Sequence, residues 1–364
     1  MIFFLCAVLV LYVVVGYPVL LALRARWGTV PVNTKPLELS VTVILPVHNG
    51  EAWIEDKIRN LLALDYPRGS VEIIVVSDGS TDATDAIAAR FPVQFVRIHK
   101  SGKAGALNCA LQRARGEILF FTDVRQPLDP MALRHLVDCF SDPAVGVATG
   151  ELTIRDGKSR EEANIGLYWK YEKWIRRRLS RIDSVLGATG CIYAMRRSLA
   201  RPMPVDTLLD DVHLPMQAFF AGYRIVMEEK ASAYDTPTGL ATEFRRKVRT
   251  QAGVYQLIGQ FPALMGVRNR MWLDFVSYKF GRLMLPFLLV GIFGSAFILT
   301  DPWRVIMVGA QVAFYSLAAA NPWIREDSLV KRLSAPAAAF TVLMLAALCA
   351  VSILVVPARR LWTR

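Results

Sequence analysis

The spacing of hydrophobic residues in the first third of the chain predicts alternating strands and helices. Four short apolar runs rich in β-branched and aromatic residues predict strands, at residues 41–46, 71–76, 93–98 and 117–122. Between the runs, apolar residues such as Ile54, Ile58 and Leu61 recur at the three- and four-residue spacing of a helix buried on one face. Strands that alternate with such helices predict an α/β fold, with a mostly parallel sheet covered by helices.

Polar residues come within two positions of the end of three of these runs, after Pro46, Val76 and Thr122. Ligands of open α/β sheets gather beyond the carboxyl ends of the strands. We therefore expect a nucleotide-binding architecture whose chemistry lies at this edge of the sheet.

The two ends of the chain are more apolar than its middle. Residues 1–23 carry no charge and reach the ~20 residues that a helix needs to cross a membrane core of ~30 Å. Arg24 and Arg26 follow this segment, whereas a signal peptide carries its positive charge before the apolar stretch, so we expect an uncleaved transmembrane helix. Three further apolar segments, at about 283–300, 303–321 and 336–357, predict transmembrane helices within residues 283–357.

The middle of the chain divides into two predicted regions. Residues 36–240 hold the α/β pattern and are expected to form the catalytic domain. Residues 241–282 mix basic and aromatic residues ahead of a membrane segment, which is typical of amphipathic helices that lie in the membrane interface.

Composition and charge place this middle part on the cytosolic side of a membrane. Of the 364 residues, 54% are hydrophobic and the mean hydropathy is +0.34, which is too apolar for an ordinary cytosolic protein. The chain has 43 Lys and Arg against 31 Asp and Glu, and loops rich in Lys and Arg stay cytoplasmic. We therefore expect an integral protein of the inner or plasma membrane, whose net charge of +12 suits contact with anionic membrane lipids.

Other features limit the class of protein further. We find no basic stripe interleaved with aromatic residues that outweighs the membrane interpretation, so nucleic acid is not an expected partner. The five cysteines match neither metal-ligand spacings nor a disulfide framework, which agrees with a reducing cytosol. If all three C-terminal segments cross the membrane, Arg359, Arg360 and Arg364 lie outside, which leaves a re-entrant or interfacial segment open as an alternative.

Four polar residues at three places in the chain are candidates for chemistry. Asp78, in VVSDGSTDAT, can accept hydrogen bonds from a base or a ribose, but an ordinary turn fits equally well. Lys103, in GKAGALN, can approach a phosphate as a point charge, although a solvated lysine at a helix start would look the same. Asp210 and Asp211 stand together at the head of an apolar run. Two acidic residues at a helix N-terminus are favoured by the helix dipole. In a partly dry pocket, a neighbouring carboxylate also raises the pKa of one of them, which makes it a better base.

These candidates belong to a series of motifs that follow one another along the chain. They read TVILPVHNGEAWIEDKIRNLLALDYP (42–67), VVSDGSTDAT (75–84), HKSGKAGALNCAL (99–111), FFTDVRQPLDP (120–130), and LLDDVHL (208–214) followed by FRRKVRTQAG (244–253). With these motifs the chain resembles the inverting family 2 glycosyltransferases, in particular the membrane-embedded cellulose, hyaluronan and poly-N-acetylglucosamine synthases. The resemblance covers roughly residues 40–256 and the flanking membrane segments.

The resemblance implies a GT-A fold, which is Rossmann-like, and a nucleotide-sugar donor, with UDP-glucose or UDP-N-acetylglucosamine expected. The residues that match donor-binding positions are Pro46, His48, Asn49, Asp78, Lys103, Asp123, Arg125 and Arg249. Of these, Asp78 matches the residue that holds the base, and Lys103 matches a basic residue near the diphosphate. His48 stands where a Tyr is common, and Gly50 stands where a Glu is common.

The metal-binding D-x-D motif of the family is incomplete in this chain. Asp123 matches its first carboxylate, which implies a Mg²⁺ or Mn²⁺ cofactor, but Arg125 stands at the second position and cannot ligate a metal. Either Asp123 and water hold the ion with weakened affinity, or Arg125 contacts the diphosphate directly through bidentate hydrogen bonds. From the sequence we favour the first account.

The resemblance also assigns the acceptor side of the reaction. Asp211 matches the general base, with Asp210 beside it. The residues that match acceptor-binding positions are Gly190, Cys191, Arg246 and Thr250. The last two depart from the Q-x-x-R-W motif of the processive synthases, because Arg246 replaces the Gln and Thr250 replaces the Trp. No aromatic platform for a growing polymer is expected at that position.

The sequence therefore predicts a membrane glycosyltransferase that moves a sugar from a nucleotide donor, with inversion, to a polysaccharide or lipid-linked acceptor. Two alternatives stay open: a single-addition enzyme that makes a glycolipid, and a catalytically weak nucleotide-sugar-binding subunit of a polysaccharide synthase. The expected partners are the donor, the acceptor, membrane lipids and, for the last alternative, further subunits of an export complex.

Overall fold

The computed structural model describes residues 1–154, 160–236 and 240–358. The chain divides into two compact units, which we describe separately. The sheet unit comprises Trp27–Arg155 and Arg176–Thr236, and the helical unit comprises Met1–Arg26, Asp156–Ile175 and Pro237–Arg364. The segment Asp156–Ile175, which lies within the predicted 36–240 domain, thus groups with the helical unit.

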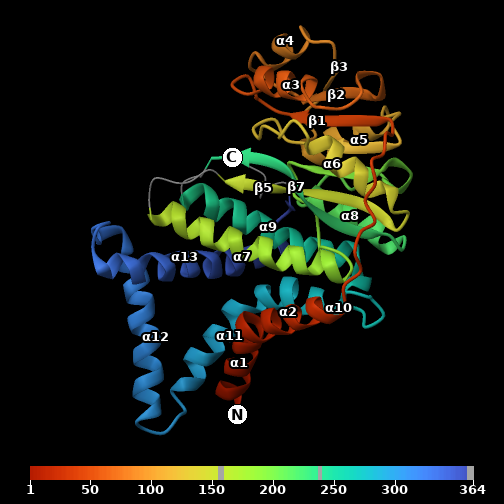
Figure 1. The fold of residues 1–364 in the computed structure, drawn as a ribbon. Helices are drawn as coiled ribbons and strands as arrows, with labels where there is room; N and C mark the ends of the chain where they lie inside the picture. The colour runs from red at the N-terminus through yellow and green to blue at the C-terminus, as the bar shows by residue number, and fades with distance from the viewer. Residues whose placement is uncertain (155–159, 237–239, 359–364) are drawn as a thin grey trace. The chain divides into compact units, whose positions relative to one another are not determined.

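The sheet unit is built on a seven-stranded mixed sheet with the strand order β3-β2-β1-β4-β6-β5-β7 (Figure 1). Its strands are β1 (Val41–Val47), β2 (Val71–Asp78), β3 (Gln94–Ile98), β4 (Ile118–Phe121), β5 (Val145–Ile154), β6 (Tyr193–Arg196) and β7 (Arg224–Asp235). Strands β1 to β4 pair in parallel, whereas β6 runs antiparallel to its neighbours β4 and β5. The α/β class and the four strands predicted from the sequence are confirmed.

Helices connect these strands. They are α3 (Ile54–Leu62), α4 (Thr84–Ala88), α5 (Gly102–Leu111), α6 (Ala132–Asp138) and α8 (Asp210–Phe220). In α3 the apolar face buries Ile54, Ile58 and Leu61, as their spacing predicts. The opposite face carries Arg59, whose guanidinium lies 2.7 Å from the carboxylate of Glu55 one turn earlier. This division of the helix surface explains why α3 packs on the sheet in one orientation.

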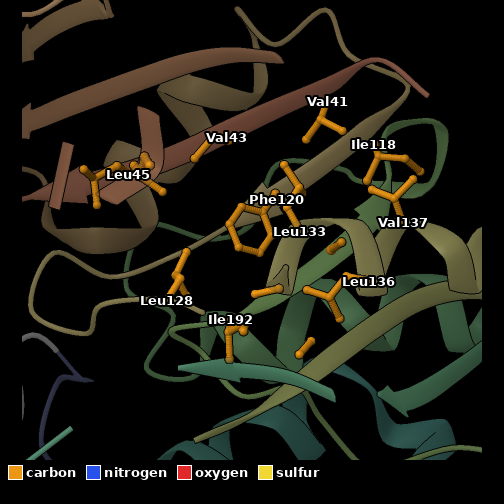
Figure 2. Close-up of a cluster of buried hydrophobic side chains, with 14 of the residues drawn as sticks. Val41, Val43, Leu45, Ile118, Phe120, Leu128, Leu133, Leu136, Val137 and Ile192 are labelled. Atoms are coloured by element: carbon orange, nitrogen blue, oxygen red, sulfur yellow. The ribbon is translucent and has the colours of Figure 1, made fainter. Parts of the chain in front are cut away.

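The main hydrophobic core of the sheet unit draws its residues from the sheet and from helices including α3 and α6. Figure 2 shows part of it, in which Val43, Phe120 and Leu136 are fully buried. Burying each such side chain contributes about 1.5–3 kcal/mol. The neighbours Val43 and Ile44 are both fully buried, so β1 is covered on both faces and reads as a continuous apolar run. This packing holds the carboxyl ends of the parallel strands in place.

The helical unit contains the candidate membrane segments. Its helices are α1 (Ile2–Leu11), α2 (Tyr17–Trp27), α9 (Leu240–Gln260), α10 (Trp272–Asp274), α11 (Gly281–Ala296), α12 (Trp303–Ala320) and α13 (Leu329–Ala350), while α7 (Arg160–Ile182) belongs to both units. Among the described residues, four helical runs are long and apolar enough to cross a membrane: Ile2–Trp27, Trp272–Ala296, Trp303–Trp323 and Leu329–Leu354. Within this unit α1 packs along α11, and α13 packs along α9 and α12.

The second and fourth candidate spans begin earlier than the sequence pattern predicts. The second starts at Trp272, inside the region 241–282 that we assign to the membrane interface, and it includes Asp274. The Asp274 side chain is fully buried and lies 2.7 Å from the guanidinium of Arg24 in α2. A paired carboxylate explains how an acidic residue is accommodated there. The terminal residues Arg359, Arg360 and Arg364, which bear on the predicted orientation, lie outside the described residues.

Candidate active site

Asp78 lies at the carboxyl end of β2, and its carboxylate is bound to the start of α5. Oδ1 accepts a hydrogen bond from the backbone N–H of Ser101 at 2.6 Å, and Oδ2 accepts one from that of Gly102 at 2.9 Å. These N–H groups have no partner within the helix, since the first turn of any helix leaves its donors unpaired. Asp78 is only 5% exposed, so the two N–H groups supply hydrogen bonds that its buried carboxylate needs.

The turn that follows β1 is joined to the turn that follows β2. The Nδ1 atom of His48 lies 2.8 Å from the carbonyl oxygen of Asp78. Asn49 has a φ of 49°, which Asn tolerates better than most residues, and its Oδ1 accepts a hydrogen bond from the N–H of Thr81 at 2.9 Å. Pro46 lies within β1 itself. The structure thus brings these predicted donor-binding residues together at the carboxyl edge of the sheet.

Lys103, in the first turn of α5, joins carboxylates from two other segments. Its Nζ lies 3.0 Å from Oδ1 of Asp123, just beyond β4, and 3.0 Å from Oδ2 of Asp210 at the start of α8. Burial alone would lower the pKa of Lys103, but three acidic neighbours outweigh burial and raise it. These neighbours are Asp123, Asp210 and Asp211. Because Lys103 follows Gly102, which binds Asp78, all four predicted carboxylates gather around the start of α5.

Asp210 and Asp211 are the first two residues of α8, and the glycine-rich turn before β6 packs against them. Asp210 is buried and Asp211 is half-buried. A Cβ atom on Gly190 would lie 3.0 Å from Oδ2 of Asp211, which is tighter than ordinary contact, so a larger residue would require this carboxylate to shift by a few tenths of an ångström. The N–H of Ala188 also donates to the carbonyl oxygen of Asp211 at 2.8 Å. The predicted base and the predicted acceptor-binding turn therefore form one local structure.

Cys191 meets this cluster through its backbone. Its carbonyl oxygen accepts a hydrogen bond from Oγ1 of Thr122 at 2.9 Å. Burial, with a smaller effect of Asp123, raises the pKa of the Cys191 thiol to about 12. The thiol is therefore neutral at physiological pH and is not a nucleophile.

Arg125, at the second position of the incomplete D-x-D motif, is paired with a carboxylate that sequence reasoning missed. Its Nη2 donates to Oδ2 of Asp235 at 2.6 Å, and Nε2 of Gln126 donates to the same oxygen at 2.9 Å. Asp235 is the last residue of β7, and its side chain is buried. These contacts anchor the turn that carries Asp123 to the end of another strand.

Two further buried residues at the cluster were not anticipated. Lys57 of α3 donates to Oγ1 of Thr122 at 2.7 Å and to the carbonyl oxygen of Gln126 at 2.5 Å. Tyr193 of β6 stacks on Phe121, and its buried hydroxyl has no hydrogen-bond partner among the described residues. Burial raises the pKa of Tyr193, and the carboxylates of the cluster raise it further. A signal for Lys57 was present, because it stands within the apolar stripe of its helix.

Asp123 is the carboxylate of the cluster that the sequence assigns to a divalent metal ion. Across residues 1–154, 160–236 and 240–358, no three His, Cys, Asp or Glu side chains are grouped so that they could hold a metal. The side chain of Asp123 is 36% exposed. Since Mg²⁺ is often bound by one or two carboxylates together with substrate phosphates and water, Asp123 fits an ion that shares the diphosphate of a donor.

The remaining predicted residues, Arg246, Arg249 and Thr250, lie on α9 in the helical unit. Within that helix, Oγ1 of Thr250 donates to the carbonyl oxygen of Arg246 at 2.8 Å. Their assignment to donor or acceptor binding stays a prediction from the sequence.

Known proteins resemble parts of this chain, and the region that a family model matches includes Asp78, Lys103 and Asp123. A family model described as glycosyl transferase family 2 matches residues 42–202. Poly-beta-1,6-N-acetyl-D-glucosamine synthase from Staphylococcus aureus (strain COL) is 27% identical over 239 residues, which are 62% of this chain and 57% of that protein. The probable glycosyltransferase YdaM from Bacillus subtilis (strain 168) is 26% identical over 271 residues, which are 68% of this chain and 63% of that protein. The chain thus spans less than two thirds of the length of these relatives.

A solved structure shares the fold. The mannosyltransferase PcManGT from Pyrobaculum calidifontis, in complex with GDP-Man and Mn²⁺, has a TM-score of 0.75 and 22% sequence identity. The match covers 98% of this chain and 99% of that one. At this identity the likeness concerns the fold, and it confirms the GT-A-like α/β class predicted from the sequence.

Proposed function

Since a glycosyl transferase family 2 model matches residues 42–202, we propose that the chain is a membrane glycosyltransferase that transfers a sugar from a nucleotide donor with inversion. The expected donor is UDP-glucose or UDP-N-acetylglucosamine, and the acceptor is a polysaccharide or a lipid-linked sugar. The observation that carries the proposal is the gathering of Asp123, Asp210 and Asp211 around Lys103. The four candidate spans and the Lys and Arg excess support a membrane protein with a cytosolic catalytic domain.

Inverting transfer needs a base that takes the proton of the acceptor hydroxyl while its oxygen attacks the anomeric carbon. Asp211 takes this role, because it is half-buried and stands next to a carboxylate whose charge Lys103 already balances. The Gly190 backbone packs against Asp211 and orients its carboxylate. The accepted proton stays on Asp211 until the product leaves.

The departing nucleoside diphosphate needs positive charge and hydrogen-bond donors. An ammonium group has three N–H donors, and two of those of Lys103 point to Asp123 and Asp210, which leaves a third for a phosphate oxygen. Asp78 keeps acceptor capacity beyond its two backbone bonds and is assigned to the base of the nucleotide. When bound, a Mg²⁺ or Mn²⁺ ion held by Asp123 would add charge that stabilises the diphosphate.

Two other functions each have a specific observation in their favour. A single-addition enzyme acting on a lipid acceptor is favoured by Thr250, which stands where the resembling processive synthases carry a Trp. A catalytically weak donor-binding subunit is favoured by Arg125, which replaces a metal-binding carboxylate and pairs with Asp235.

Product length separates these functions. The full chain is reconstituted in lipid vesicles and supplied with radiolabelled UDP-glucose, UDP-N-acetylglucosamine or GDP-mannose. Labelled chains of many sugars support a polysaccharide synthase, and a lipid that carries one added sugar supports the single-addition enzyme. If folded protein binds a donor but releases no nucleotide from any of the three, the transferase proposal is wrong and the binding subunit is supported.

A further inference from the structure

We propose that Lys57 is a positioning residue for donor binding, whose buried ammonium holds both ends of the turn at residues 122–126 and so sets where Asp123 meets the diphosphate. The inference deepens the proposed function and rests on it. It adds to the site a residue from α3, a helix that carries none of the residues assigned above to donor, acceptor or metal.

The contacts of Lys57 are directed at this turn alone. Its Nζ donates to Oγ1 of Thr122 at 2.7 Å and to the carbonyl oxygen of Gln126 at 2.5 Å, so the two bonds flank Asp123 on either side. The residue is 2% exposed, and within the described parts of the chain it forms no ion pair. Neither hydrogen bond goes to a carboxylate, although the charge of Asp123 in the same turn acts on the ammonium and partly offsets the effect of burial on the pKa of Lys57.

A charged group at this position needs an explanation. A buried ammonium that lacks an ion pair lowers the stability of the fold, and an apolar side chain of similar length would pack there without that penalty. Burial lowers the pKa of Lys57 to about 8, so the side chain is still mostly protonated at neutral pH. What the charge adds is stronger hydrogen bonding, because charge-assisted bonds are about twice as strong as neutral ones.

The same contacts reach the acceptor side of the cluster. The Thr122 hydroxyl that accepts from Lys57 donates in turn to the carbonyl oxygen of Cys191. The preceding residue, Gly190, packs against Asp211. One ammonium thus connects the turn of Asp123 with the turn that orients the proposed base. Partners of this outer kind typically change affinity or activity by about 10–100-fold when they are removed.

Three variants of the full chain test the inference. Lys57→Met removes the charge and both hydrogen bonds at similar side-chain length, and Lys57→Arg keeps a charge. Ile58→Val is the control, since Ile58 is the next residue of α3 and is fully buried, but makes no polar contact with the turn. Hydrogen exchange of peptides covering residues 118–128 reports on the turn. Donor KM and kcat are measured with whichever of UDP-glucose, UDP-N-acetylglucosamine and GDP-mannose the wild type uses.

We expect Lys57→Met to accelerate exchange in residues 118–128 and to lower kcat/KM about 10–100-fold, mainly through the donor KM. Lys57→Arg should recover most of that loss, and Ile58→Val should match the wild type in both measurements. Should Lys57→Met fail to fold, Lys57→Gln, which keeps a donor without the charge, is judged by the same criteria.

Unchanged exchange in the turn, or a folded Lys57→Met with kcat/KM close to the wild-type value, would overturn the inference. The result that contradicts this inference differs from the result that contradicts the proposed function. A wild type that releases no nucleotide from any of the three donors contradicts the transferase, while the exchange measurement still decides whether Lys57 holds the turn.

Discussion

At the scale of single residues, Lys103 balances the charge of the candidate site. Without its ammonium, Asp123 and Asp210 would be left as carboxylates with no cation at 3.0 Å, in a cluster that also holds Asp211. A diphosphate would then approach a site of its own charge. In the proposed mechanism the residue therefore has two roles, to hold the acidic groups together and to offer a donor to the departing phosphate.

Lys103→Met is expected to lower kcat/KM by about 10²–10³-fold, the range found when one transition-state donor is removed. The control is Arg59→Met, since Arg59 forms an exposed ion pair with Glu55, and such pairs contribute only about 0–1 kcal/mol. Nucleotide release from reconstituted protein measures both. Equal activity of the two variants would mean that Lys103 is an ordinary surface lysine.

The pH dependence of this effect has a definite sign. The pKa of Lys103 is raised in the folded chain above its ordinary value of 10.5. Its contribution to stability is therefore fully present below pH 10.5 and is lost only as the pH rises beyond that value. We expect the difference in melting temperature between wild type and Lys103→Met to stay constant from pH 6 to pH 9. A difference that shrinks within this window would show that the ammonium titrates there.

Part of this cluster was predictable, because several of its residues stand in short local sequence motifs. Asp78, Lys103 and Asp211 are candidates from their local sequence, and the resemblance to the family assigns roles to them and to Asp123. Asp235 was not, because its partner Arg125 is 110 positions away and a lone acidic residue at the end of a strand carries no local signal. Tyr193 was missed for the same reason, since its hydroxyl matters only through the carboxylates that the fold brings near it.

At the scale of elements, parallel pairing of β1, β2 and β4 places the candidate residues. Register aligns the carboxyl ends of these strands, so the residues that follow them meet at one edge. These strands were predictable because they are covered on both faces and read as continuous apolar runs. Strands β6 and β7 were not, since β6 has four residues and follows a glycine-rich turn, and β7 carries polar residues along its length.

The turn before β6 allows a test at this scale. In Gly190→Ala the new methyl group would lie 3.0 Å from Oδ2 of Asp211 and push the carboxylate from its position. We expect kcat to fall at least about tenfold while donor KM changes little, since a small misplacement of a catalytic group is costly. Gly69→Ala is the matched control, because no atom lies within 4 Å of its added methyl group. If both variants keep wild-type kcat, the packing of Gly190 does not orient the base.

At the scale of the whole molecule, the chain combines a sheet unit with a helical unit whose membrane character was visible in its composition. The bounds of the spans were harder to predict, because the second span includes Asp274 and a hydropathy pattern stops at a charge. The structure accounts for this residue through its ion pair with Arg24. A charged pair inside an apolar unit is thus part of how the first two candidate spans associate.

Removing that pair should loosen the helical unit. Arg24→Ala leaves the fully buried Asp274 with the hydroxyl of Tyr17 but without its cation, and because Arg24 is 31% exposed the cost is expected below the about 3–5 kcal/mol of a fully buried pair. The melting temperature in detergent is expected to fall clearly. Arg26→Ala, two residues along and exposed, should melt as the wild type does. Identical melting of all three proteins would show that the ion pair does not hold the spans together.

The measurement that tests the central claim most directly is release of nucleoside diphosphate from wild type and Asp211→Asn, each with and without Mn²⁺, in vesicles that contain the acceptor. The account predicts that wild type releases the nucleotide and loses most of this activity when the metal is chelated. Asp211→Asn should be slower by about 10²–10⁴-fold with little change in donor KM, because it lacks the base but keeps the donor contacts. An Asp211→Asn protein that turns over donor as fast as wild type would contradict the assignment of Asp211 and the mechanism built on it.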